Sequence, residues 1–281
     1  MDLRPSIAGS WYPADRDRLR QSLERMFDSI DNPPQLEGRL QALVVPHAGH
    51  RYSGQVAAHG FAQVRGLDPK PDRVLILGPL HQYRQSPLLT SQHDAYQTPL
   101  GKVPVDRLLV DRIADRLRET WQLDLVPIRQ DSEHSIEVEL PFLQWVLGDF
   151  AFVPLMISDQ RKEIVQRLAH AIVWALDGES ALIVASSDLS HYYPQHAANT
   201  LDREMLRRME RLDPSSVLQA EQEGVGFACG KGAIAASLWA SMERGAEHAQ
   251  VMDYATSGDV SGDYSAVVGY ASVAISGTSG Q

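Results

Sequence analysis

Three short apolar runs constrain the fold of this 281-residue chain more than any other feature. They occupy residues 40–46, 73–77 and 181–185, and each is close to continuous rather than alternating between apolar and polar side chains. Continuous runs of this length are typical of strands that are buried on both faces of a parallel sheet. Such strands need helices above and below the sheet, so the runs favour an α/β fold.

Apolar stripes with helical spacing separate the strand-like runs. The first stripe begins after Asp15, a helix-capping residue, and ends in a loop around residues 32–34. Further stripes cover residues 53–64, 105–117, 164–176, 201–212 and 234–242, and further strand-like segments cover residues 150–157 and 265–275, the last of them alternating. This order predicts a three-layer α/β/α sandwich with a mostly parallel central sheet. No composition shift, repeat or linker divides residues 1–281, which predicts a single domain.

Composition and charge argue against several classes of protein. The chain is 43% hydrophobic and 22% charged, and no apolar run reaches the length of a membrane helix. Its 26 Lys and Arg against 36 Asp and Glu give a net charge of −10, which disfavours nucleic acid as a partner. The N-terminal residues lack the apolar core of a signal peptide, and a single cysteine needs no oxidising compartment. We therefore expect a cytoplasmic protein.

Polar side chains come directly after each of the three apolar runs. His47 follows the first run, His81 the second, and Asp188 and His191 the third. Because the carboxyl ends of parallel strands share one edge of the sheet, where ligands bind, we expect these four side chains to converge. Any one of them alone is more simply interpreted as a hydrogen-bonded loop residue. Five other histidines keep that structural interpretation: His59 and His170 in helices, His196 in a helix region, and His93 and His248 in loops.

The only cysteine, Cys229, lies in a glycine-rich segment directly before the stripe at 234–242. A thiol at a helix N-terminus is favoured as the thiolate, which is the form that binds metal. The alternative is a buried, inert cysteine. The segment is no nucleotide loop, because Val225 replaces the first glycine of the Walker pattern and Gly232 follows its lysine.

The densest polar run covers residues 131–144. Glu133 and His134 lie where a helix would begin, and Pro141 should break or kink that helix. Two interpretations stay open at this point. Glu133 and His134 either face the same site or belong to a solvated, capped helix face.

Two neutral imidazoles and one anionic ligand suit a divalent transition metal with open coordination positions. A carboxylate as the anion would indicate non-haem Fe(II), whereas a thiolate brings Cu(I) and zinc into competition with iron. His191 is placed to act as an acid or base, and Asp188 can orient an imidazole.

Several motifs together resemble the Memo family, whose bacterial and archaeal members are called AmmeMemoRadiSam system protein B. The ordered match runs from Arg4 to the final predicted strand, which is nearly the whole chain. The matching segments are residues 4–13, 46–54, 77–81, 133–137 and 186–192, and the pair Cys229-Gly230.

The resemblance implies a fold like that of class III extradiol dioxygenases, which are non-haem iron enzymes. It implies that His47, His81 and Cys229 are the metal ligands, with Fe(II) the first candidate and copper or zinc the alternatives. Candidate catalytic residues are His191, Asp188 and His134. His50 stands where the family commonly has tyrosine, and it either adds a ligand or fills the pocket. Radical-SAM and AMMECR-type proteins are the partners that the resemblance implies.

Three functions compete on the sequence. The first is a metal-dependent redox enzyme related to dioxygenases, although the family's cysteine replaces their carboxylate ligand. The second is a hydrolase whose nucleophile is Cys229, or Ser187 with His191 and Asp188. The third is a non-catalytic module that binds a peptide or small molecule near Trp11, Tyr12 and His191. A polar stretch at residues 82–102 is expected to cover the pocket.

Overall fold

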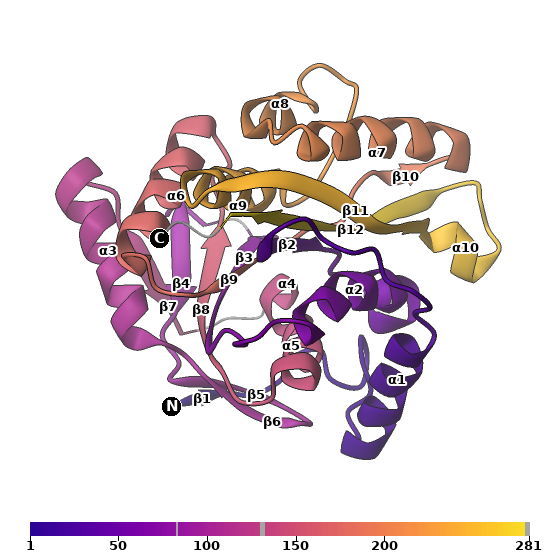
Figure 1. Ribbon diagram of the computed structural model, residues 1–281, viewed down its shortest axis with the longest axis horizontal. Coiled ribbons are helices and arrows are strands. Elements are labelled where there is room, and N and C mark those ends of the chain that lie inside the picture. The colour runs from indigo at the N-terminus through magenta and orange to yellow at the C-terminus, as the bar shows by residue number, and fades with distance from the viewer. Residues whose placement is uncertain (83, 130–132, 279–281) are drawn as a thin grey trace.

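The computed structural model describes residues 1–82, 84–129 and 133–278, and a large mixed β-sheet lies at its centre (Figure 1). In spatial order its strands are β10 (His191–Tyr193), β12 (Val267–Gly277), β2 (Arg39–Val45), β9 (Leu182–Ser186), β3 (Arg73–Pro79), β8 (Ala151–Ile157), β4 (Leu88–Ser91) and β7 (Leu125–Ile128), and β11 (Ala246–Thr256) also pairs with β12. The three apolar runs of the sequence are β2, β3 and β9. They lie next to one another with β9 in the middle.

The middle of the sheet is parallel, and antiparallel strands flank it on both sides. β2, β9, β3 and β8 run in the same direction, whereas β12 runs against β2 and β4 runs against β8. The predicted α/β class is confirmed, with a mixed sheet. β12 was expected to alternate, but it is buried at nearly every position because helices cover both faces of the sheet.

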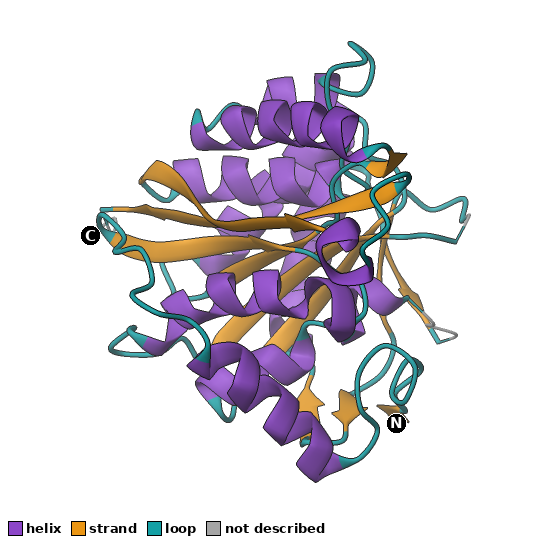
Figure 2. Ribbon diagram, turned by 90° about the vertical axis from the view of Figure 1, so that its right-hand side faces the viewer, coloured by secondary structure: helices purple, strands orange, loops and turns teal. Residues whose placement is uncertain are grey.

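Helices pack on both faces of the sheet (Figure 2). One face carries α9 (Lys231–Glu243), α6 (Lys162–Leu176), α3 (Arg107–Trp121), α7 (Gln195–Glu210) and α8 (Pro214–Gln219). The opposite face carries α2 (His50–Arg65), α5 (Leu140–Leu147) and α1 (Arg16–Asp28). Two short helices are α4 (His134–Glu137) and α10 (Ser257–Ser261). No helix in the described part of the chain is long and apolar enough to cross a membrane.

Local sequence signals explain where helices begin. The side chain of Asp15 accepts a hydrogen bond from the Arg18 backbone amide, and α1 then buries Leu19, Leu23 and Phe27 against α2 and α5. The predicted break near Pro141 is present, because α4 ends at Glu137 and a separate α5 follows. The proline occupies the first turn of α5, where its missing N–H would have no partner in the helix. Residues 131 and 132 of that polar run lie outside the described residues.

Short strands account for about half of the stretch at 82–102, which we had expected to cover the pocket. It contains β4 and also β5 (Ala95–Thr98), which forms a small second sheet with β1 (Asp2–Leu3) and β6 (Gly101–Pro104). Residue 83 lies outside the described residues. The loop placement of His248 was also wrong, since this residue lies on β11.

Candidate metal centre

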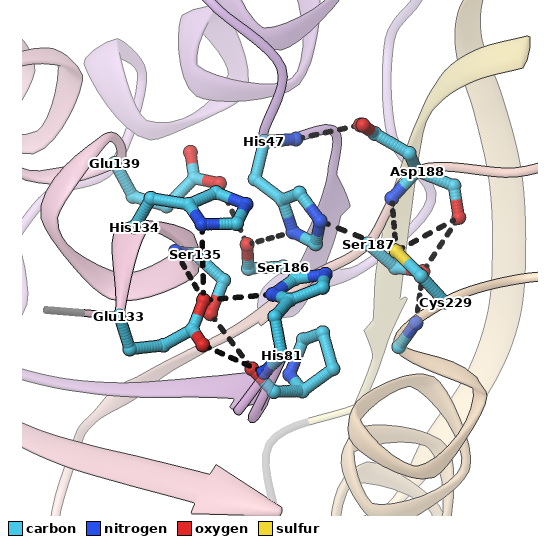
Figure 3. Close-up of polar contacts among 12 residues, drawn as sticks. His47, His81, Glu133, His134, Ser135, Glu139, Ser186, Ser187, Asp188 and Cys229 are labelled. Carbon is cyan, nitrogen blue, oxygen red and sulfur yellow. Dashed lines mark hydrogen bonds and ion pairs between the residues drawn. The ribbon is translucent and has the colours of Figure 1, made fainter. Parts of the chain in front are cut away.

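The register of the parallel strands brings the predicted strand-end residues to one edge of the sheet. Val45 of β2 lies beside Ser186 of β9, and Leu77 of β3 lies beside Ala185. The chain therefore leaves all three strands at the same level, with His47 and His81 just beyond it. Figure 3 shows both rings pointing into one space between the strand ends.

Three imidazole rings meet in that space. The ring centroid of His47 lies 5.2 Å from that of His81 and 5.3 Å from that of His134, and the His81 and His134 rings stack at 4.4 Å. One nitrogen from each ring lies within 4.8 Å of the other two, which is close enough for one ion to touch all three. His134, which we had expected to act in catalysis, is therefore a further candidate ligand.

The sulfur of Cys229 reaches the same space. Its Sγ lies 3.2 Å from Nε2 of His47 (Figure 3). This approach needs a glycine at the next position, because a Cβ on Gly230 would lie 2.5 Å from the carbonyl oxygen of Ser186. The structure thus brings Cys229 to His47 and His47 to His81, whereas the group of ligand atoms that lie within 4.8 Å of one another contains the three histidines and not the sulfur. The role of His47, His81 and Cys229 as ligands stays a prediction.

Hydrogen bonds fix the orientation of two of the rings. Ser186 donates its hydroxyl to Glu139 at 3.0 Å, so its oxygen accepts from Nδ1 of His47 at 2.8 Å. Nδ1 of His81 donates to the Glu133 carboxylate at 2.8 Å. Both contacts leave Nε2 as the nitrogen with the lone pair, which on His47 faces the Cys229 sulfur. Partners of histidine ligands in metal sites impose the same arrangement.

Glu133 is buried and holds the His81 loop through backbone contacts as well. Its carboxylate accepts from the backbone amides of His81 at 2.7 Å and Ser135 at 3.0 Å. Burial alone would raise the pKa of Glu133, but the hydrogen bonds from His81 and Ser135 outweigh it and lower the pKa to about 2. Of the two interpretations of the polar run, the site-facing one holds for Glu133 and His134.

Asp188 holds a backbone and not an imidazole, in contrast to the expected role. Its Oδ1 accepts from the backbone amide of His47 at 2.8 Å, and its own backbone amide donates to the Cys229 sulfur at 3.2 Å. Burial raises the pKa of Asp188 to about 7. Asp188 therefore links the His47 and Cys229 segments to each other.

His191 lies at the side of this space. Its Nδ1 donates to the carbonyl of Leu189 at 2.7 Å, and its ring packs edge-on against Phe227. Burial lowers the pKa of His191, so the neutral ring with a free Nε2 is favoured. The Ser187 hydroxyl donates to the Asp188 carbonyl, and no hydrogen bond to His191 is present among the described residues. This geometry offers no support for Ser187 as the nucleophile of a hydrolase.

Comparison with known proteins shows the family of this chain. The family model described as "Memo-like protein" matches residues 4–274. The chain belongs to the Memo family.

Its relatives match over almost their entire lengths. A MEMO1 family protein of Methanopyrus kandleri is 36% identical over 97% of this chain and 98% of its own. A MEMO1 family protein of Sulfolobus acidocaldarius is 37% identical over 96% of this chain and 97% of its own. Among solved structures, an uncharacterized protein from Escherichia coli K12 aligns with a TM-score of 0.48 and 14% identity, over 85% of this chain and all of its own.

A cavity of about 630 Å³ opens onto the candidate centre of this Memo protein. Its walls include the three rings of the cluster and Asp188, and its remaining lining is mainly aromatic: Trp11, Tyr52, Tyr192, Tyr270 and His191, with Arg51. No described residue of the stretch at 82–102 lines it, so the described part of that stretch does not form the pocket wall.

Two further ring residues of this Memo protein, Tyr12 and His50, lie outside the lining of the cavity. Tyr12 does not line the cavity; it is buried behind it, and its hydroxyl donates to Glu137 at 2.6 Å. His50 packs against Phe142 and Tyr12, outside the three-ring cluster. Burial lowers the pKa of His50 to about 4, so this residue fills the core as a neutral ring.

Sequence reasoning missed the supporting residues Ser186, Glu137 and Glu139. Glu137 and Glu139 are both buried, 1% and 0% exposed, beside apolar positions of the same segment. The available signal was their spacing, because Glu137 and Glu139 alternate with the apolar residues Ile136, Val138 and Leu140. Acidic residues that alternate with apolar ones cannot all lie on one solvent-exposed helix face.

Proposed function

We propose that this Memo protein is a metal-dependent redox enzyme whose ion is held by His47, His81 and Cys229. The observation that carries the proposal is the 3.2 Å approach of the Cys229 sulfur to Nε2 of His47, whose ring centroid lies 5.2 Å from that of His81. Imidazole and thiolate donors select transition metals over magnesium or calcium. Iron is the first candidate, with copper and zinc as alternatives.

His134 gives the proposal a second donor set. The three imidazoles alone could hold an ion, and Cys229 would then lie beside it. Replacement of Cys229 or of His134 separates the two arrangements, because only a ligand should be needed for tight binding.

A bound iron or copper ion would supply redox chemistry at this site, whereas zinc would not. The residues of the chain prepare that centre. Ser186 orients the His47 ring and Glu133 orients the His81 ring. Burial raises the pKa of Cys229 to about 12 in the metal-free protein, so metal binding by the sulfur must displace a thiol proton. His191 presents a neutral ring at the cavity wall, where it can accept a proton from a bound molecule.

Metal content after anaerobic purification tests this function. Iron and copper are measured by mass spectrometry in the wild type and in His81→Ala, Cys229→Ser and His134→Ala. His50→Ala is the matched control, because it removes an imidazole that packs outside the cluster. We expect the wild type and the control to carry metal and His81→Ala to lose it. Equal, negligible iron and copper in the wild type and His81→Ala would overturn the proposal.

A non-catalytic binding module is the alternative function. The observation in its favour is the aromatic lining of the cavity, where Tyr192 is 76% exposed and the Trp11 ring lies 4.4 Å from that of His134, tilted by 45°. Tight, metal-independent binding of a peptide or small molecule without turnover would favour this function. Radical-SAM and AMMECR-type partners and a cytoplasmic location stay proposals that rest on the family resemblance and on the sequence.

A further inference from the structure

A second cavity lies at the opposite end of the central strands from the histidine cluster. Its walls come from the start of β2, the turn before β9 and the chain between α9 and β11, and its volume is about 450 Å³. Because β2 spans roughly 20 Å at the usual rise per residue, the two cavities are separate. This volume lies in the range of small-molecule sites.

Two arginines of this cavity have no carboxylate partner. Arg39 donates to the hydroxyl of Ser180 at 2.9 Å, and Arg244 donates only long bonds of 3.4–3.5 Å to the carbonyls of Ala181 and Glu179. Within residues 1–82, 84–129 and 133–278 neither guanidinium forms an ion pair. Both side chains line the same cavity, and burial together with the neighbouring Arg39 charge lowers the pKa of Arg244.

The nearby carboxylates are already engaged elsewhere. Glu179 pairs with Arg73 and with Arg112, and Glu243 pairs with His170. A partly buried guanidinium without a counter-ion is unfavourable, because burial removes its water without replacing the lost interactions. An anion that enters the cavity would relieve both the desolvation and the repulsion.

Gln41 adds a neutral recognition element. It is 6% exposed, and its Nε2 donates to the Arg244 carbonyl at 3.2 Å. Its Oε1 is buried without a hydrogen-bond partner. A buried acceptor of this kind calls for a donor. Less than 1 Å² of this oxygen is accessible, so a hydroxyl group on the ligand would supply the donor once the Gln41 side chain turns toward the cavity.

We propose that this cavity binds a small phosphate monoester that carries a hydroxyl group. Arg39 and Arg244 hold the phosphate oxygens, and Gln41 accepts from the hydroxyl. A phosphate suits the site better than a single carboxylate, because it offers several oxygens and up to two charges to two guanidinium groups. The site is independent of the proposed metal centre.

Calorimetric titration of the full chain tests the proposal with glycerol 3-phosphate, inorganic phosphate, glycerol and succinate as probes. We expect glycerol 3-phosphate to bind more tightly than phosphate, and glycerol and succinate to show no measurable binding. Arg39→Gln and Arg244→Gln should each weaken glycerol 3-phosphate binding by about tenfold or more. Arg39 is exposed, so its variant keeps the test valid if Arg244→Gln fails to fold.

Arg51→Gln is the matched control, because Arg51 lines the cavity of the histidine cluster instead. It should leave glycerol 3-phosphate affinity unchanged. Absence of binding at millimolar concentration, equal binding by Arg39→Gln, or loss of binding in Arg51→Gln would overturn the proposal. Binding of succinate as tight as that of glycerol 3-phosphate would overturn the choice of a phosphate monoester.

Discussion

Nδ1 of His47 lies 2.8 Å from the hydroxyl oxygen of Ser186, on a strand that is adjacent in space but far away in sequence. Ser186 is held in turn by the buried carboxyl group of Glu139 at 3.0 Å. β2 and β9 are paired in parallel just before these residues. The strand register therefore sets which nitrogen of His47 contacts Ser186 and which one faces Cys229. The sheet therefore determines the chemistry that the ring can offer.

Removal of this hydroxyl should weaken metal binding. Ser186→Ala leaves the His47 ring without its partner, and loss of such a contact typically lowers metal affinity by about 10–100-fold. Competition with a chelator of known affinity measures the effect. Ser190→Ala is a suitable control, since Ser190 is equally buried and its hydroxyl touches no imidazole among the described residues. Equal affinities of both variants and the wild type would contradict the orienting role.

Glu139 should make the stability of the metal-free protein depend on pH. Complete burial raises the pKa of Glu139 well above its ordinary value of 4.5, so the folded protein holds the proton more tightly than the unfolded chain does. Its contribution to the free energy of unfolding is complete below pH 4.5 and is lost as the pH rises toward the folded-state pKa.

The Glu139→Gln variant, which cannot ionise, should lack this slope. Urea unfolding of both proteins from pH 5 upward, in the presence of a chelator, measures the difference between them. The wild type should lose up to about 1.4 kcal/mol per pH unit relative to the variant. Parallel pH profiles would show that Glu139 ionises normally in the folded state.

Loss of Glu137 should release the N-terminal segment from the site. Its buried carboxylate accepts from the backbone and hydroxyl of Ser6, from the backbone of Ile7 and from the Tyr12 hydroxyl. Glu137→Ala leaves these donors unpaired, at a loss of about 3 kcal/mol or more in the free energy of unfolding. Tyr12→Phe removes only one contact and should lose less.

Hydrogen exchange detects the local part of this effect. In Glu137→Ala, the amides of residues 6–12 should exchange faster than in the wild type, because the segment that places Trp11 against His134 loses its anchor. Unchanged protection of that segment would mean that other contacts hold it.

Gly230→Ala should displace the Cys229 sulfur more than it destabilises the fold. The added Cβ would lie 2.5 Å from the Ser186 carbonyl and 2.8 Å from the Ser187 Cβ, so the Cys229 segment must move away. If Cys229 is a ligand, metal affinity should fall by about tenfold or more. Gly66→Ala, where a Cβ meets nothing within 4 Å, should keep wild-type affinity. Unchanged affinity in Gly230→Ala would favour the three-imidazole donor set.

The positions of His47 and His81 could be predicted because strand order and strand ends are visible in the sequence. A continuous apolar run indicates a buried strand, and parallel pairing then places the residues that follow it together. Cys229 could be included through its place before α9 and through the family motif. These inferences need only local patterns and one topological rule.

The roles of His134 and Asp188 could not be read in the same way. His134 reaches the cluster from the start of α4, and its position depends on how that helix packs against β3. Asp188 could touch either a ring or a backbone, and only the three-dimensional path of the loop decides between them. The short strands β4, β5 and β6 were missed because four residues carry too little periodicity to separate a strand from a loop.

Val268 and Tyr270 form part of the cavity wall, and both belong to β12, the last strand of the chain. This strand pairs with β10, β11 and β2, so these three strands complete their pairing only when β12 is present. During synthesis the histidines and the cysteine all emerge from the ribosome before the wall that encloses them. The site therefore acquires its final shape only after β12 has joined the sheet, and a nascent chain that stops before Val267 would carry every proposed ligand without part of the cavity wall.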